Sequence, residues 1–199
     1  MKKSVLFFAF VFFGILSYGQ SAGDITLAPQ IGLNISNFDY DNLVGDEDFE
    51  SSTGFRAGVI GEYYFTETWS LRSGLVYDSL GSELGDIDFN LNYLFVPLNA
   101  NWHFGSDNNW YLNFGPALGF LLDATAEDSG EEEDLKDTLK GLDFGLSLGI
   151  GYKFEVSEGV VLFADIQGFR GFIDLNDSDS DLELYNIRSA FNVGAIFKL

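Results

Sequence analysis

Residues 142–156 read Leu-Asp-Phe-Gly-Leu-Ser-Leu-Gly-Ile-Gly-Tyr-Lys-Phe-Glu-Val, and this stretch decides the fold. Every even position is apolar, whereas the odd positions carry only Asp, Gly, Ser, Lys and Glu. A period of two is typical of a β-strand with one apolar and one polar face, because successive side chains point to opposite sides. The stretch is also longer than the ~9–11 residues that a strand needs to cross a membrane.

The same alternation recurs in seven further stretches. They cover roughly residues 25–35, 53–66, 69–80, 87–104, 110–124, 160–173 and 183–199. Short connections at 66–68, 105–109 and 157–159 alternate with longer ones at 38–52, 79–86, 125–141 and 174–182. Eight strands with tight turns at one end and long loops at the other predict an all-β fold. The specific expectation is an eight-stranded antiparallel transmembrane up-and-down β-barrel with its short turns in the periplasm.

The alternation changes phase within residues 87–104. Apolar residues occupy odd positions up to Phe95 and even positions from Leu98 onward. Two explanations remain open. Either Pro97, which cannot donate a ladder hydrogen bond, marks a β-bulge, or the segment before it stands clear of the membrane.

The apolar face is expected to meet lipid. An eight-stranded barrel has an interior only just wide enough to be filled by side chains, and the apolar faces carry far more bulk than that. The opposite face is rich in small residues such as Gly145, Ser147, Gly149 and Gly151, which suit a crowded lumen. A secreted soluble barrel that carries an apolar ligand is the alternative that this volume argument disfavours.

Composition excludes several classes of protein. A formal net charge of −21 is opposite to what binding of nucleic-acid phosphates requires. The absence of Cys excludes disulfides, thiolate zinc sites and cysteine nucleophiles. The single His, His103, lies on the polar face near a short turn, where we expect a structural hydrogen-bonding role. No catalytic residue, cofactor or metal site is predicted.

The N-terminus is typical of an export signal. Lys2 and Lys3 precede an apolar run over residues 4–16, and Ser17 and Gly19 supply small residues before a cleavage point. We therefore expect a signal peptide over residues 1–19 and a barrel domain over residues 20–199. The predicted location is the cell outer membrane.

Aromatic residues gather beside the short turns. The predicted members of a periplasmic-side girdle are Trp69, Trp102, Trp110, Tyr152 and Phe197. Amphipathic rings prefer the membrane interface, so their common level predicts one edge of the apolar band.

Two ion pairs are predicted inside the lumen. A three-residue loop at 66–68 sets Phe65 opposite Trp69 and thereby fixes the register of the two flanking strands. That register places Glu62 opposite Arg72 and Arg56 opposite Asp78, all on the inward face. The hypothesis is that these pairs fill and rigidify the lumen.

The long loops are acidic. Residues 177–181 read Asp-Ser-Asp-Ser-Asp, which resembles the start of a calcium loop. However, Leu182 replaces the required Gly, and Arg188 stands where the bidentate Glu belongs. Divalent cations that bridge the loops to lipopolysaccharide phosphates are one candidate partner, and a merely solvated rim is the simpler interpretation.

Several motifs carry a family resemblance. They are residues 18–20 (Tyr-Gly-Gln), 54–58 (Gly-Phe-Arg-Ala-Gly), 93–98 (Tyr-Leu-Phe-Val-Pro-Leu), 112–119 (Leu-Asn-Phe-Gly-Pro-Ala-Leu-Gly) and 191–199 (Phe-Asn-Val-Gly-Ala-Ile-Phe-Lys-Leu). Together they resemble the PorT-type outer-membrane β-barrel family of Gram-negative bacteria, over nearly all of the chain after residue 19. The resemblance implies the fold and no catalytic residues. Most such relatives look like barrels without an assigned activity, and the name-giving member is associated with protein secretion.

These observations predict a non-enzymatic outer-membrane β-barrel. Its role would be structural or interactive, with long acidic surface loops and a lumen filled by side chains. An accessory of protein secretion or envelope assembly is the alternative, and a lipid hydrolase or acyltransferase acting at the rim is a third hypothesis. Expected partners are outer-membrane lipid, lipopolysaccharide and other envelope proteins, but not nucleic acid.

Overall fold

The computed structural model of the chain describes residues 21–41, 48–157, 160–178 and 181–199. The predicted signal peptide, residues 1–19, lies outside the described residues. None of the helices within the described ranges is long and apolar enough to span a membrane.

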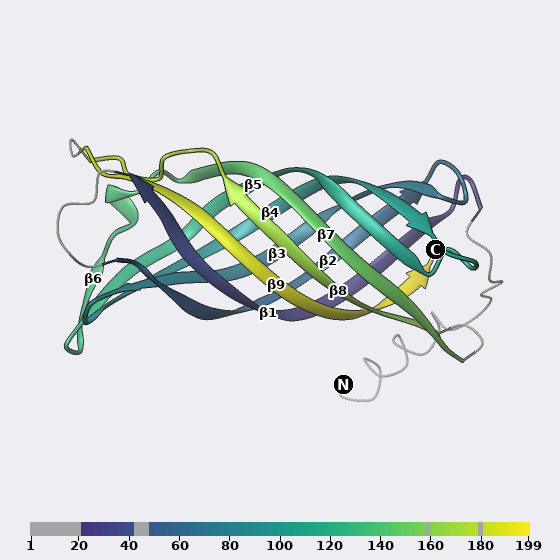
Figure 1. The fold of residues 1–199 in the computed structure, drawn as a ribbon, viewed down its shortest axis with the longest axis horizontal. Helices are drawn as coiled ribbons and strands as arrows, with labels where there is room; N and C mark the ends of the chain where they lie inside the picture. Colours follow the sequence, from purple (N-terminus) through teal and green to yellow (C-terminus); the bar gives the residue numbers. More distant parts are fainter. Residues whose placement is uncertain (1–20, 42–47, 158–159, 179–180) are drawn as a thin grey trace, which may run out of the picture.

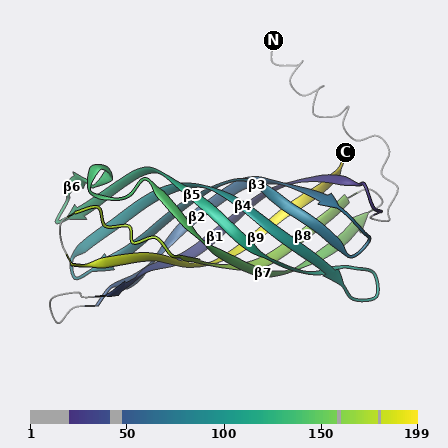
Figure 2. The ribbon, with the colours of Figure 1, turned by 90° about the horizontal axis from the view of Figure 1, so that it is seen from above.

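Eight long strands of the described chain form a closed antiparallel barrel, which confirms the predicted fold (Figures 1 and 2). They are β1 (Ile25–Asp41), β2 (Glu50–Tyr64), β3 (Trp69–Leu84), β4 (Ile87–Phe104), β5 (Trp110–Asp128), β7 (Leu142–Ser157), β8 (Val160–Gly171) and β9 (Glu183–Lys198). Each strand pairs with the next barrel strand, and β9 pairs with β1 to close the sheet. A short strand, β6 (Glu131–Asp134), and a 3-10 turn, η1 (Lys136–Thr138), lie between β5 and β7.

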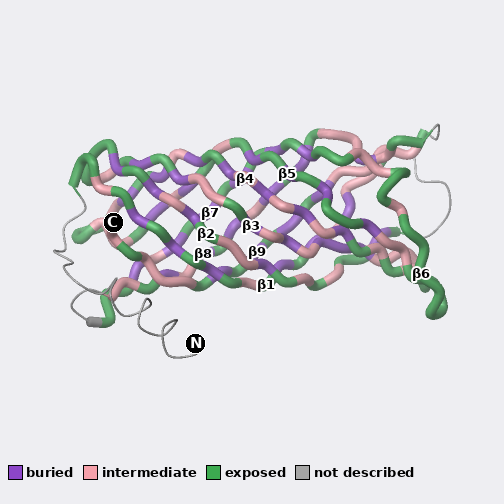
Figure 3. Tube along the Cα trace, turned by 180° about the vertical axis from the view of Figure 1, so that it is seen from behind, coloured by how far each residue is buried: buried purple, intermediate pink, exposed green. Residues whose placement is uncertain are grey.

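The apolar face points outward, as predicted. Along β7 the even positions are mostly exposed and the odd positions are buried as far as Lys153, so that Leu148 is 59% exposed whereas Asp143 is fully buried. Figure 3 shows the same alternation of exposed and buried residues along the other barrel strands. Because exposed apolar side chains surround the barrel, its natural surroundings are hydrocarbon.

The phase change in β4 has a different cause from a bulge at Pro97. Pro97 pairs regularly with Ala117, and the register shift of the β4–β5 ladder lies at Asn92 and Tyr93. Before Pro97 the apolar side chains point inward, since Tyr93 and Phe95 are at most 1% exposed. The outward positions Asp88, Asn90 and Asn92 are polar, so the second explanation fits the part of β4 before Tyr93, which extends beyond the apolar band.

The β4–β5 shift also corrects the predicted facing of Ala124. The pairs run from Asn92 with Asp123 to Tyr93 with Leu121, which leaves Leu122 as the extra residue of β5. Such a bulge inverts the alternation beyond it. Ala124, assigned to the lipid face by simple alternation, is therefore fully buried inside.

Two of the predicted long loops, 79–86 and 125–141, are shortened because their flanking strands continue into them. Leu84 pairs with Ile87 across a two-residue turn, in which Gly85 has a φ of 62°. β5 continues to Asp128 and turns through Ser129 and Gly130, whose φ values are 52° and 87°, into β6. Two-residue hairpins favour residues that tolerate positive φ, so these Gly-containing dipeptides were signals of tight turns.

The barrel interior has two halves. The half near the long loops is packed with large apolar side chains, including Phe38, Phe49, Leu91, Phe95 and Leu175. Most of the buried charged side chains lie between the short turns and the level of Asp78, which is the cross-strand partner of Tyr93. The expectation of a lumen filled mainly by small residues therefore holds only in part.

Candidate functional site in the barrel lumen

Eight Asp, Glu, Lys and Arg side chains are buried in the lumen within the described ranges. Four are carboxylates and four are cations: Glu62, Asp78, Asp143 and Asp165, and Arg56, Arg72, Lys153 and Arg188. All lie on the inward phase of their strands, which brings them into the lumen. An isolated buried ion costs several kcal/mol, so these groups must compensate one another. Their equal numbers permit this in a chain that is otherwise strongly acidic.

Asp78 is the centre of one ionic group. Its Oδ2 lies 2.8 Å from Arg56 Nη1 and 3.1 Å from Arg188 Nε. Asn34 Nδ2 donates to Asp78 Oδ1 at 3.2 Å, and Arg56 Nη2 donates to Gln167 at 3.1 Å. The β2–β3 register places Arg56 opposite Asp78, as the three-residue loop predicts. The contact with Arg188 crosses the lumen from β9.

Asp165 is the centre of a second group. Arg72 Nη2 lies 3.4 Å from Asp165 Oδ2, to which the Tyr111 hydroxyl donates at 2.8 Å. Asn192 Nδ2 donates to the other carboxylate oxygen at 2.6 Å. The Arg72 guanidinium also lies over the Tyr111 ring, 5.2 Å from its centroid.

The predicted Glu62–Arg72 pair is present in register but not as an ion pair. The two residues are direct cross-strand partners. Arg72 nevertheless forms its ion pair with Asp165 of β8, because a long side chain in a narrow barrel can cross the lumen. Glu62 takes other partners.

Glu62, His103 and Lys153 form a third group near the short turns. Glu62 Oε1 lies 2.7 Å from His103 Nε2, and it also accepts hydrogen bonds from Asn101 and Ser70. Lys153 Nζ lies 3.1 Å from His103 Nδ1. An ammonium only donates, so His103 Nδ1 accepts from Lys153, and the protonated Nε2 donates its hydrogen bond to Glu62 Oε1. A neutral imidazole thus bridges a buried anion and a buried cation.

This third group lacks the geometry of a catalytic triad. Ser70 Oγ and Glu62 Oε1 both meet the same nitrogen, His103 Nε2, at 3.0 and 2.7 Å. In a triad, the nucleophile and the carboxylate bind opposite nitrogens of the imidazole. Among the residues described, no three His, Cys, Asp or Glu side chains converge to hold a metal ion. The arrangement can orient and neutralise charge.

Lumen glycines make room for aromatic side chains of the network. Gly151 is the cross-strand partner of Tyr111, and Gly194 is the partner of Phe163. A Cβ atom at Gly151 would overlap the Tyr111 phenol that donates to Asp165. The small residues of β7 therefore serve to place rings and charges from neighbouring strands.

Rings of the predicted girdle lie on the outer surface at the short-turn end. Trp69, Trp102 and Trp110 are 40–43% exposed. Trp69 stacks on Trp102 with centroids 6.3 Å apart, and Trp110 meets Tyr152 at 4.9 Å. Phe197 lies near the same end of β9 and is 38% exposed. Their role at a membrane interface remains a prediction.

The opposite rim carries a row of carboxylates on neighbouring strands. Cross-strand pairs link, in order, Glu50, Glu83, Asp88, Glu127 and Glu132, one from each of β2 to β6. We call these five residues the acidic row. Like charges directly opposite one another destabilise a sheet, so the acidic row weakens the rim at which it stands.

Neutralising one member of the acidic row should stabilise the β5–β6 hairpin. Glu127 is the cross-strand partner of both Asp88 and Glu132. We therefore expect Glu127→Gln to slow hydrogen exchange of the hairpin amides, with a rise of ~0.2–1 kcal/mol in the free energy of local opening. Asp123→Asn is the matched control, because Asp123 pairs with the uncharged Asn92. Equal effects of the two changes, or no response to added salt, would argue against repulsion within the row.

The loop proposed as a calcium site is organised by a lysine. Lys140 Nζ donates to the Asp174 and Asn176 carbonyl oxygens at 2.8 and 2.9 Å, and it lies 3.4 Å from Asp174 Oδ2. Partial burial raises the pKa of Asp174, but backbone N–H groups of Leu184 and Asn176 and the Lys140 ammonium outweigh it, so the pKa lies below its ordinary value. Residues 179–180 of the calcium-like stretch lie outside the described residues.

Sequence reasoning missed Asp165, Lys153 and Arg188 as members of the network. Their signal was available, because each is a charged residue on the polar phase of its strand. What was missing was the choice of partner, since the ionic contacts join strands that are not neighbours.

Comparisons with known proteins agree with this geometry. The family described as outer membrane protein beta-barrel domain matches residues 18–177. The outer membrane protein OprG from Pseudomonas aeruginosa has a similar fold, with 13% identity, coverage of 91% of this chain and 98% of that chain, and a TM-score of 0.54. Neisserial surface protein A is similar at 16% identity, covering 84% and 97%, with a TM-score of 0.50. No curated protein matches the sequence.

Proposed function

Because this chain belongs to the outer membrane protein beta-barrel domain family, we propose that it is a non-enzymatic outer-membrane protein with a structural or interaction role. Its outer wall would engage outer-membrane lipid and lipopolysaccharide. Its long-loop rim, which carries the acidic row, would meet the exterior or other envelope proteins.

The observation that carries the proposal is the filled lumen. The ion pairs of Asp78 with Arg188 and of Asp165 with Arg72 cross the lumen, and large apolar side chains pack inside it toward the long loops. Eight strands leave space for side chains and little else. A function that needs passage of a solute through the lumen is therefore disfavoured. The outer wall and the rim loops are the surfaces on which a function would depend.

A second candidate function is an accessory role in protein secretion or envelope assembly. The motifs that resemble the PorT-type family support it, among them residues 54–58 and 93–98. A lipid hydrolase or acyltransferase at the outer rim has less support. The single histidine, His103, is 1% exposed and lies in the lumen near the short turns.

The filled lumen predicts that the purified barrel conducts no ions. In planar lipid bilayers we expect the current with the purified barrel to equal that of the bilayer alone. A sixteen-stranded porin, measured under the same conditions, is the conducting control. Stable open-channel steps from the purified barrel would show that the lumen is not closed and would remove the main support of the proposal.

Deletion of the gene in the native host separates the two candidate functions. A structural role predicts higher uptake of a hydrophobic dye, restored by the intact gene, with secreted proteins unchanged. Loss of secreted proteins with normal dye uptake would instead support the secretion accessory. The deletion strain can also be complemented with a lumen variant such as Asp165→Asn. If this variant restores dye exclusion, the function does not need the lumen network and depends on the outer surface.

A further inference from the structure

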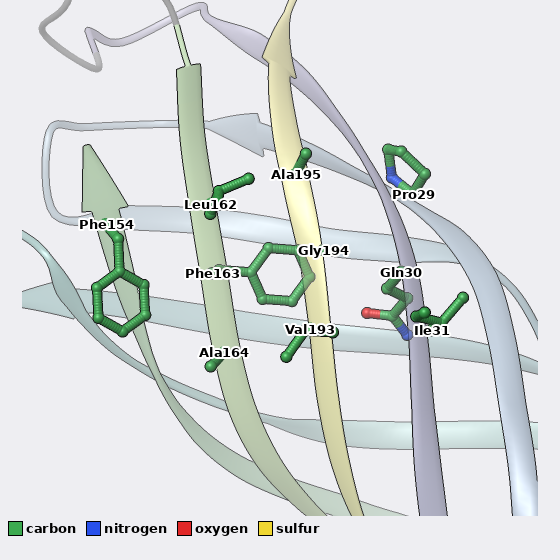
Figure 4. Close-up of a pocket in the computed structure, with 10 residues that line it drawn as sticks. All are labelled: Pro29, Gln30, Ile31, Phe154, Leu162, Phe163, Ala164, Val193, Gly194 and Ala195. Carbon is green, nitrogen blue, oxygen red and sulfur yellow. The ribbon is translucent and has the colours of Figure 1, made fainter. Parts of the chain in front are cut away.

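A hollow lies in the outward-facing wall of the barrel, across β7, β8, β9 and β1. Its volume is about 550 Å³, and its lining includes Ile31, Leu162, Ala164, Val193 and Ala195. Figure 4 shows these side chains on three neighbouring strands, with Phe154 on the strand beside them.

The cross-strand register explains why the wall is recessed here. Leu162 is opposite Ala195, and Ala164 is opposite Val193, so that small and large side chains alternate between adjacent rows. Leu162 and Val193 are each 40% exposed and form the walls. The two alanines lower the floor toward the backbone.

The hollow is bounded along the barrel axis. The next outward row on the long-loop side contains Ile166 opposite Phe191, which are 58% and 54% exposed. On the short-turn side, Phe197 of the predicted girdle follows Ala195 along β9. The hollow therefore lies within the apolar band, in the half nearer the short turns, which are predicted to lie in the periplasm.

We propose that this hollow holds one acyl chain of a phospholipid from the periplasmic leaflet. The outward-facing side chains that line it are all apolar, so it offers nothing to a headgroup. Gln30, drawn in Figure 4, lies on the inward phase and is 4% exposed. Hydrocarbon surrounds the wall of a membrane barrel, and a thin, flexible chain can reach a floor recessed below its neighbours. The inference depends on membrane location and is independent of the proposed role.

Filling the hollow should remove the bound lipid. We would reconstitute the barrel in nanodiscs of phosphatidylethanolamine and phosphatidylglycerol, extract it in mild detergent, and count retained phospholipids by native mass spectrometry. Ala195→Leu should lower retention of one phospholipid by about tenfold, because its side chain takes the place of acyl methylenes. Ala100→Leu is the matched control: the same change, on an outward position of β4, half-way around the barrel.

Folding of each variant is established first by its heat-modifiable migration on a detergent gel. If Ala195→Leu gives no folded band, Ala164→Leu is read by the same assay. The proposal is supported if the unaltered protein and Ala100→Leu retain the phospholipid and the variant that fills the hollow loses it. Equal retention of phospholipid by all three proteins, or no retention by any of them, would overturn the proposal. So would a spectrum in which Ala195→Leu removes a dimer of the barrel and leaves phospholipid retention unchanged.

Discussion

Replacing Asp78 with Asn should destabilise the barrel by about 3–5 kcal/mol, because removing one member of a buried ionic group leaves its partners uncompensated. Asp78 is fully buried and lies within 3.1 Å of two guanidinium groups, those of Arg56 and Arg188. The change keeps the size of the side chain and removes only its charge. Reversible urea unfolding in lipid vesicles, followed by the shift of the folded gel band, measures the loss.

A double-mutant cycle separates the charge effect from general damage to the lumen. Arg56→Met combined with Asp78→Leu should cost less than the sum of the single changes, with a coupling above about 1 kcal/mol. The control is Asp123→Asn, which removes an outward-facing charge toward the long-loop end of β5. It should change the free energy of unfolding little. Additive single effects would mean that the ion pair does not stabilise the lumen.

The second large effect concerns the outer wall. Leu148→Arg should destabilise the barrel by ~2–4 kcal/mol, the cost of a cation on the lipid face near the bilayer midplane. Leu148 is 59% exposed and lies in the middle of β7, opposite Phe114. Its exposure would make such a change harmless in water, so a large cost identifies hydrocarbon as the surrounding medium.

The matched control for this prediction lies on the same face of the same strand. Leu142, 42% exposed, begins β7 at the long-loop end. Leu142→Arg should cost only ~0–1 kcal/mol, because the penalty falls near the interfaces. Refolding titrations of both variants give the depth dependence, and equal costs at the two positions would be inconsistent with a membrane-embedded wall.

The strand order and the facing of most strands could be predicted because each depends on one strand or one hairpin. Alternation in residues 142–156 puts Leu148 and Gly151 on opposite faces, and the bulk of the apolar faces then assigns Leu148 to lipid and Gly151 to the lumen. The Thr66–Thr68 connection fixes the register that sets Arg56 opposite Asp78. These are local consequences of pleating and of loop length.

The composition of the interior could not be predicted in the same way. Tyr93 and Phe95 look like lipid-facing residues in sequence, yet they fill the outer half of the lumen beside Phe169. Residues 93–98 are apolar on both faces, so alternation within this segment does not show which side chains point inward. The ionic partners Arg72 and Asp165 also meet across the lumen, where side-chain reach decides the contact.

Spin-label accessibility along β7 tests the central claim, an apolar wall in lipid around a filled lumen. The chain has no Cys, so single-cysteine variants at positions 142–150 can each be labelled in liposomes without background. The fold predicts high accessibility to oxygen dissolved in the bilayer at the even positions. It predicts low accessibility at the odd positions, both to oxygen and to a water-soluble nickel complex. High nickel accessibility at positions 145, 147 and 149, or no alternation, would contradict it.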